Sequence, residues 1–143
     1  MAIVEKSVLI ERTAAQMFDL VDRVEDYPQF LPWCGGTELI ERTDSRTAAR
    51  IHIDYHGLKA HFATENAKEA PRWMDIRLTE GPFRRLDGHW RFTPLSETAC
   101  KVEFRLHYEF SGRLLEKALG PVFSHIANTF VESFVKRASQ VHV

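Results

Sequence analysis

Residues 101–110 read KVEFRLHYEF, with apolar side chains at every even position and polar side chains at every odd position. This strict alternation predicts a β-strand with one face toward an apolar interior and the other toward water. From Arg113 the spacing of apolar residues changes to that of a helix, and it continues as far as Ala138. We therefore expect the strand to be followed by one amphipathic helix of about 28 residues.

Alternation of the same kind recurs through most of the preceding chain. It predicts an antiparallel sheet of six or seven strands, with turn-forming glycine, proline and aspartate residues between the strands. The expected strands are residues 3–10, 37–42, 46–55, 58–65, 73–78, 86–92 and 101–110.

Two short helices are expected between the first two strands. Thr13 is followed three residues later by Gln16, which is the pattern of a capping box at a helix start. A second short helix is expected from Val24 to Phe30. Pro32 and the Gly35-Gly36 pair are then expected to end regular structure before the next strand.

One long helix packed on a curved sheet defines an α+β fold, with a single domain over residues 1–143. Pro121 predicts a kink or a break in that helix near residues 117–120, because proline cannot donate to the carbonyl group four residues back. A helix about 10 Å wide cannot fill the concave face of such a sheet, so we expect a space between them.

Composition restricts the possible functions of the chain. The 143 residues carry a formal net charge of −1, which excludes a global electrostatic case for binding DNA or an anionic membrane. Ten phenylalanines against three tyrosines and three tryptophans indicate a large apolar interior or an interior with a cavity. Two cysteines, Cys34 and Cys100, and the lack of an evident signal peptide predict a cytoplasmic chain with reduced thiols.

Three motifs resemble those of a known family. They are YPQFLPWC at residues 27–34, GPF at 81–83 with LDGHWRF at 86–92, and FVESFVKRA at 130–138. Together they resemble the START-like family (SRPBCC, polyketide cyclase/dehydrase type), which contains coenzyme-Q-binding proteins and the ribosome-association toxins named RatA. The resemblance covers nearly the whole chain in the same order of elements.

The resemblance implies a helix-grip fold with an apolar cavity, and it leaves two functions open. Our first interpretation is non-catalytic binding of ubiquinone or a related polyisoprenoid lipid in support of respiration. No other cofactor is required, and transient contact with the inner membrane is implied. The alternative is a RatA-type toxin that binds the large ribosomal subunit and inhibits translation by blocking subunit joining.

Aromatic and aliphatic residues at inward positions are the candidate ligand-binding residues. Phe30 and Trp33 lie in or beside a loop flanked by proline and glycine, where a mobile apolar tip would open the cavity; simple core packing is the alternative. The hydroxyl groups of Tyr55 and Tyr108 are candidates to donate to a quinone carbonyl, with a hydrogen bond to the backbone or to water as the alternative. The full set is Phe30, Trp33, Tyr55, Phe62, Phe83, Trp90, Phe104, Tyr108, Phe123, Ile126 and Phe130.

Other groups of residues give weaker indications of a metal, catalytic or RNA-binding site. His52, Asp54 and His56 are of types that bind zinc or iron, but their strand face is expected to be solvated, and we predict no metal site. No local motif places a nucleophile beside a base, so we predict no catalytic residue. Arg84 and Arg85 are the candidates for contact with ribosomal RNA, with a mixed surface balanced by acidic neighbours as the alternative.

Overall fold

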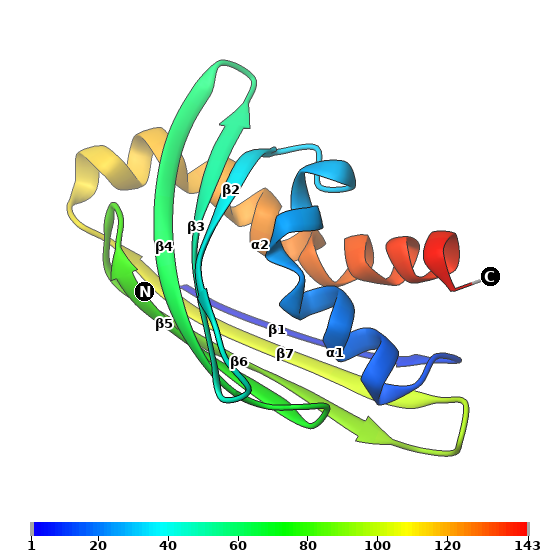
Figure 1. The fold of residues 1–143 in the computed structure, drawn as a ribbon. Coiled ribbons are helices and arrows are strands. Elements are labelled where there is room, and N and C mark those ends of the chain that lie inside the picture. The colour runs from blue at the N-terminus through cyan, green and yellow to red at the C-terminus, as the bar shows by residue number, and fades with distance from the viewer. Residues whose placement is uncertain (1, 143) are drawn as a thin grey trace.

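Seven antiparallel strands form one curved sheet in the computed structural model, which describes residues 2–142 (Figure 1). The strands are β1 (Ala2–Ile10), β2 (Cys34–Arg42), β3 (Arg46–Tyr55), β4 (Leu58–Glu69), β5 (Trp73–Glu80), β6 (Phe83–Pro94) and β7 (Cys100–Phe110). Their order across the sheet is β1-β7-β6-β5-β4-β3-β2, so only β1 pairs out of chain order. The predicted antiparallel sheet is confirmed.

Three helical segments lie on the concave side of the sheet. They are α1 (Ala14–Asp22), the 3₁₀ helix η1 (Val24–Gln29) and α2 (Arg113–Val141). Figure 1 shows α2 crossing the concavity, with α1 and η1 on the same side, connecting β1 to β2. This is the predicted α+β arrangement, in which a curved sheet grips one long helix.

The helix α2 runs without interruption through Pro121, so of the two predicted outcomes a break does not occur. Proline removes one backbone N–H group from the helix. The partly buried Leu119 before it and the buried Phe123 after it both pack against the core, which holds the helix together across that position.

Within residues 2–142, no helix combines the length and the hydropathy that a membrane crossing requires.

The capping box at the start of α1 is confirmed. The backbone N–H of Gln16 donates to Thr13 Oγ1 at 3.1 Å, and the N–H of Thr13 donates to Gln16 Oε1 at 2.9 Å. The box satisfies backbone donors that have no partner inside the helix. It therefore sets where the chain turns from β1 into α1.

The sequence predicts that this strand begins after the two glycines, at residue 37. In the structure β2 begins at Cys34 instead. Gly36 pairs with His52 on β3, and the register shifts between Cys34 and Gly36. A Cβ atom at Gly35 would lie 2.8 Å from Cβ of Asp54, closer than two such atoms approach. Gly35 therefore permits close contact between β2 and β3 instead of ending the strand.

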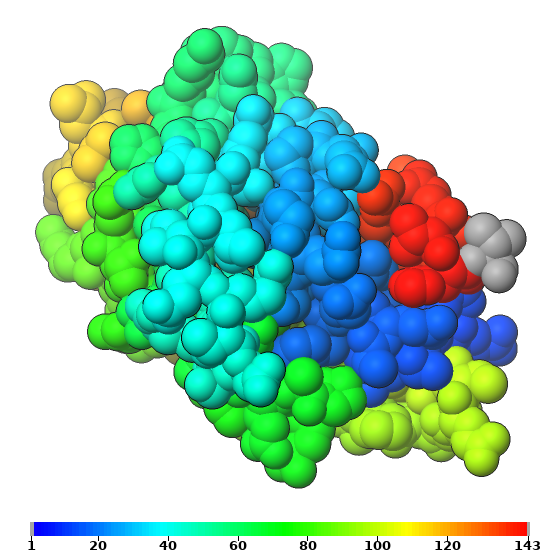
Figure 2. All heavy atoms as spheres, in the orientation of Figure 1, coloured from blue at the N-terminus to red at the C-terminus, as the bar shows by residue number. Residues whose placement is uncertain are grey.

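Alternation along the strands sorts side chains between core and solvent as expected. On β7 every even position from Val102 to Phe110 is buried, and Lys101, Glu103 and Arg105 are half-buried or exposed. On the face shown in Figure 2, atoms of β2 lie directly against those of η1. The interior is therefore covered on this side by the connection between β1 and β2.

Candidate functional site

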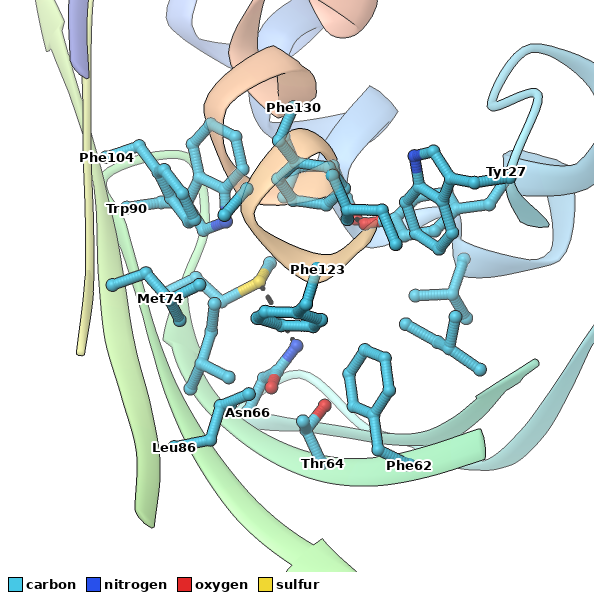
Figure 3. A pocket seen from close by; sticks show the side chains of 18 residues that line it. Tyr27, Phe62, Thr64, Asn66, Met74, Leu86, Trp90, Phe104, Phe123 and Phe130 are labelled. Carbon is cyan, nitrogen blue, oxygen red and sulfur yellow. Dashed lines mark hydrogen bonds between the residues drawn. The ribbon is translucent and has the colours of Figure 1, made fainter. Parts of the chain in front are cut away.

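The sheet and α2 enclose an apolar cavity of about 70 Å³ (Figure 3). In Figure 3, Phe123 and Phe130 extend from α2, and Phe62, Thr64 and Leu86 extend from the sheet toward them. The lining consists of Val21, Val24, Tyr27, Trp33, Ile51, Phe62, Thr64, Asn66, Met74, Ile76, Leu86, Trp90, Phe104, Leu106, Phe123, Ile126, Ala127 and Phe130. The cavity thus occupies the space expected between a curved sheet and a single helix.

Regular backbone geometry brings these side chains to one place. Phe62, Thr64 and Asn66 alternate along β4, so they share the concave face of the sheet. Phe123 and Phe130 are two turns apart on α2 and share its inner face. Local sequence periodicity therefore determines most of the wall.

Aromatic rings make the wall dense around Trp90, which is 1% exposed. Its ring centroid lies 4.5 Å from that of Phe104, 5.5 Å from Phe134 and 5.8 Å from Phe130. The pair with Phe134 is edge-to-face, and the other two are tilted by 40° and 47°. Aromatic pairs contribute about 0.5–1.5 kcal/mol each beyond the burial of their area. The cavity is thus bordered by a rigid aromatic cluster at this end.

No charged side chain belongs to the cavity lining of residues 2–142. The hydroxyl group of Tyr27 donates to the carbonyl oxygen of Val21 at 2.5 Å. Burial is the main cause that raises the pKa of Tyr27 far above its ordinary value, so the phenol stays neutral. The remaining polar groups of the lining are those of Trp33, Thr64 and Asn66.

Two polar atoms of the lining are buried without a hydrogen-bond partner in the described chain, Nε1 of Trp33 and Oδ1 of Asn66. The amide nitrogen of Asn66 donates only to the thioether sulfur of Met74, at 3.5 Å. Thioether sulfur is a weak acceptor. The Asn66 side chain is therefore poorly satisfied by the protein itself.

Many of the residues predicted from the sequence meet at this cavity. These are Trp33, Phe62, Trp90, Phe104, Phe123, Ile126 and Phe130. Trp33 is 3% exposed, so here it forms part of the closed wall.

Phe30 and Phe83 lie outside the lining, in neighbouring aromatic packing. The ring of Phe30 contacts that of Phe134 at 5.3 Å between centroids, and the guanidinium of Arg137 lies 5.2 Å from the Phe30 centroid. Phe83 stacks on Phe110 at 4.9 Å. Both rings pack against residues beside the cavity rather than facing it.

The two tyrosines proposed to bind a carbonyl group also lie outside the lining. Tyr55 is half-buried and stacks on His125 of α2 at 5.7 Å. The ring of Tyr108 packs against Phe123 at 4.7 Å, and burial raises the pKa of Tyr108. The polar groups that do reach the cavity come instead from other residues, Thr64 and Asn66 among them.

Sequence reasoning missed Asn66 and the contribution of the α1–η1 segment. The predicted strand ended at residue 65, whereas β4 continues to Glu69 and carries the alternation on to Asn66. Extending the same period by one step would have found it. Tyr27 lies in the YPQFLPWC motif, but a 3₁₀ helix has no face that periodicity predicts over so few residues.

A polar cluster joins the end of α1 to the sheet, and sequence reasoning missed it as well. It is buried at Asp22 and Lys68 and exposed at Arg42 and Glu25. The carboxylate of Asp22 accepts from Thr47 Oγ1 at 2.7 Å and from Lys68 Nζ at 2.9 Å. Arg42 donates to the carbonyl oxygen of Asp22 at 2.7 Å and to both carboxylate oxygens of Glu25 at 2.8 Å. Hydrogen bonds from Arg42 lower the pKa of Glu25 to about 2.

The residues considered for a metal do not form one cluster. His56 has a φ of 51° in the turn after β3, so it leaves the alternation of that strand. His52 Nε2 lies 2.7 Å from Glu38 Oε1, and Arg50 Nη1 lies 2.8 Å from the other oxygen of Glu38. The outer face of β2 and β3 thus carries a network of ion pairs and hydrogen bonds.

Arg84 and Arg85 are both exposed and both have carboxylate neighbours. Arg84 Nη1 lies 3.6 Å from Glu109 Oε1, and Arg85 Nε lies 3.2 Å from Asp87 Oδ1. Acidic residues therefore balance the two predicted ribosome contacts locally.

Residues 10–135 match the family described as polyketide cyclase / dehydrase and lipid transport. The chain belongs to this family. A relative from Vibrio cholerae, named ribosome association toxin RatA, is 40% identical over 139 residues, covering 97% of this chain and 96% of that protein. RatA of Escherichia coli strain K12 is 38% identical over 139 residues, covering 97% and 88% of the two chains.

A more distant relative carries the other name that the motifs suggested. The mitochondrial coenzyme Q-binding protein homolog B of Xenopus laevis is 24% identical over 131 residues, covering 89% of this chain and 54% of that protein. The predicted START-like relationship is therefore confirmed.

Solved structures agree with the fold. An 18 kDa protein of Caulobacter crescentus has a TM-score of 0.74 at 31% identity, with 99% of both chains covered. A START superfamily protein of Mycobacterium smegmatis has a TM-score of 0.75 at 21% identity, with 97% of this chain and 98% of that chain covered. The START-like helix-grip architecture of this family member is thus established.

Proposed function

We propose that the chain binds a neutral hydrophobic ligand, ubiquinone or a related polyisoprenoid lipid, in the cavity between the sheet and α2, without chemical change. The observation that carries this proposal is a buried cavity whose lining is apolar and aromatic and holds no charge. Small-molecule sites have this character, with a few polar groups that orient the ligand. The lipid transport in the family description and the name of the Xenopus relative support it.

The size of the cavity adds a condition to this proposal. Its volume of about 70 Å³ is less than half the roughly 150 Å³ of an engineered cavity that binds benzene. A quinone ring therefore enters only if the wall moves. We assign this movement to Phe30 and Trp33, which join η1 to β2 and whose rings contact Phe134 and Phe130 of α2.

The polyisoprenoid tail would leave through the same opening. A tail of this kind is insoluble in water, so loading and release require contact with a membrane. We therefore propose that the protein is cytoplasmic and contacts the inner membrane transiently.

Two measurements on the purified protein test ligand binding. Mass spectrometry of organic extracts is expected to detect a quinone or a related lipid, and titrated ubiquinone is expected to quench tryptophan fluorescence because Trp33 and Trp90 line the cavity. Phe62→Asp should weaken both signals, whereas Leu95→Asp, at an exposed loop position, should not. Extracts that repeatedly contain no lipid, together with no quenching, would rule the function out.

Ribosome association is the second candidate function, and the names of relatives that are 38% and 40% identical favour it. By this proposal the chain docks on the large ribosomal subunit and blocks subunit joining. Sucrose-gradient sedimentation at low salt is the test, with co-sedimentation in subunit fractions as the expected result. Protein found only at the top of the gradient contradicts it.

Charge reversal locates the ribosome contact. Arg84→Glu with Arg85→Glu should remove the protein from subunit fractions, because phosphate contacts are electrostatic. The control is Arg72→Glu. Arg72 is also exposed and also has an acidic neighbour, Glu69. It lies just before β5, at the opposite end of that strand from Arg84 and Arg85. Phe62→Asp should weaken ligand retention more than it weakens sedimentation with the subunit, which separates the two functions.

A further inference from the structure

The cavity wall contains polar atoms for which the protein supplies no partner. Oδ1 of Asn66 and Nε1 of Trp33 are both buried and unpaired within residues 2–142. Buried polar groups in folded proteins are almost always paired, and an unpaired one lowers stability. A ligand group is therefore expected to complete them, an expectation that rests on the ligand-binding function proposed above.

The position of the Asn66 amide indicates which hydrogen-bond partner it lacks. Figure 3 shows its amide on β4 at the floor of the cavity, next to Thr64 and below Phe123. Its nitrogen is directed to the sulfur of Met74, at 3.5 Å, which leaves the oxygen as the unpaired atom. A carbonyl oxygen only accepts hydrogen bonds, so the missing partner is a donor.

The rest of the lining restricts the donor to an uncharged one. No lysine, arginine, histidine or acidic residue belongs to the lining, so a buried ammonium or carboxylate on the ligand would have no counter-charge. For a quinone-type lipid, the ligand class proposed above, the neutral donor is a hydroxyl group. Trp90 and Phe104 border the cavity with their ring centroids 4.5 Å apart and their planes tilted by 40°. A further aromatic ring packs well beside such rings, so a hydroxyl group on an aromatic ring fits best.

We infer that the cavity selects the reduced hydroquinone form of its ligand over the oxidised quinone form. A hydroquinone hydroxyl group donates to Asn66 Oδ1, and its oxygen still accepts from a donor such as the hydroxyl of Thr64. A quinone carbonyl has no hydrogen, so it leaves Asn66 Oδ1 unpaired. The indole N–H of Trp33 donates to a ring oxygen in either form and does not discriminate between them.

Calorimetric titration under anaerobic conditions tests the inference. The probes are a short-tailed ubiquinol, the matching ubiquinone and the dimethyl ether of the ubiquinol, which keeps the reduced ring but lacks both donors. The ubiquinol is expected to bind about tenfold tighter than the other two, the effect of one unpaired buried acceptor. Asn66→Leu should weaken ubiquinol to the level of ubiquinone, and Asn128→Leu, an exposed position on α2, should change nothing.

The outcomes separate this inference from the function on which it rests. Equal binding of ubiquinol and its dimethyl ether overturns the inference and leaves ligand binding intact, and this comparison uses the wild-type chain alone. An undiminished preference for ubiquinol in folded Asn66→Leu also overturns the assignment to Asn66. If neither redox form binds the wild-type chain, the proposed function fails and the inference fails with it.

Discussion

The Nζ atom of Lys68 on β4 lies 2.9 Å from Oδ2 of Asp22, the last residue of α1, and their side chains are only 5% and 12% exposed. Thr47 of β3 donates to the other carboxylate oxygen at 2.7 Å. One carboxylate therefore anchors the end of α1 to two strands. Because α1 and η1 supply Val21, Val24 and Tyr27 to the cavity, this anchor also holds one wall of the site in place.

Lys68→Met should destabilise the protein by about 1–3 kcal/mol, since it removes the buried ammonium partner of Asp22 and leaves Arg42 Nε, at 3.3 Å, as the remaining counter-charge of that carboxylate. The free energy of unfolding from urea titration measures the loss. Lys59→Met, on the same strand but exposed, is the control and should change stability by less than about 0.5 kcal/mol. Equal effects of the two substitutions would show that the buried pair does not hold α1.

Phe130→Ala should cost about 3–5 kcal/mol of stability, because it removes a large ring that packs on Trp90 and Phe104. The same substitution enlarges the cavity next to its aromatic wall. Ubiquinone is then expected to associate faster, since less of the wall must move, and stopped-flow fluorescence measures this rate. A slower association in a folded variant would argue against entry limited by the wall.

Gly35→Ala should destabilise the protein by about 1–3 kcal/mol, as overpacking does in a dense region. The added methyl group would lie 2.8 Å from Cβ of Asp54. Gly36→Ala is a matched control, because no atom lies within 4 Å of the added group there. Thermal unfolding of both variants distinguishes the close strand contact from a general effect of losing a glycine.

Acid should destabilise the wild-type protein partly through Glu25. Hydrogen bonds from Arg42 lower the pKa of Glu25 from 4.5 to about 2 in the folded state. Below the unfolded-state pKa the unfolded chain binds more protons, so this stabilisation is complete above about 4.5 and is lost as pH falls toward about 2. Glu25→Gln should flatten the fall in urea midpoint across this interval, and Glu97→Gln, in an exposed loop, should retain it.

Much of the fold was predictable because its signals are local. Alternation on β7 and helical spacing on α2 each depend on neighbouring residues, and both correspond to one buried face. The cavity residues on strand centres, such as Phe62 and Trp90, follow from the same rule. Their placement needed no knowledge of the tertiary structure.

The remaining features depend on contacts between distant segments. Asp22 and Lys68 are 46 residues apart, and no local pattern indicates that a buried lysine has a partner there. Tyr55 and Tyr108 have the correct inward parity, but their positions along the strands place them beyond the cavity. Parity predicts the face of a residue and not its position along the strand, which the curvature of the sheet and the path of α2 determine.

The pairing of the first strand with the last has a consequence for synthesis. Val4 lies opposite Leu106, so β1 has no partner until the chain has been made through β7. Contacts of such long sequence separation form late and slow folding. The nascent chain therefore leaves the ribosome with β1 unpaired and partly apolar, and the cavity is completed only after α2 has also emerged.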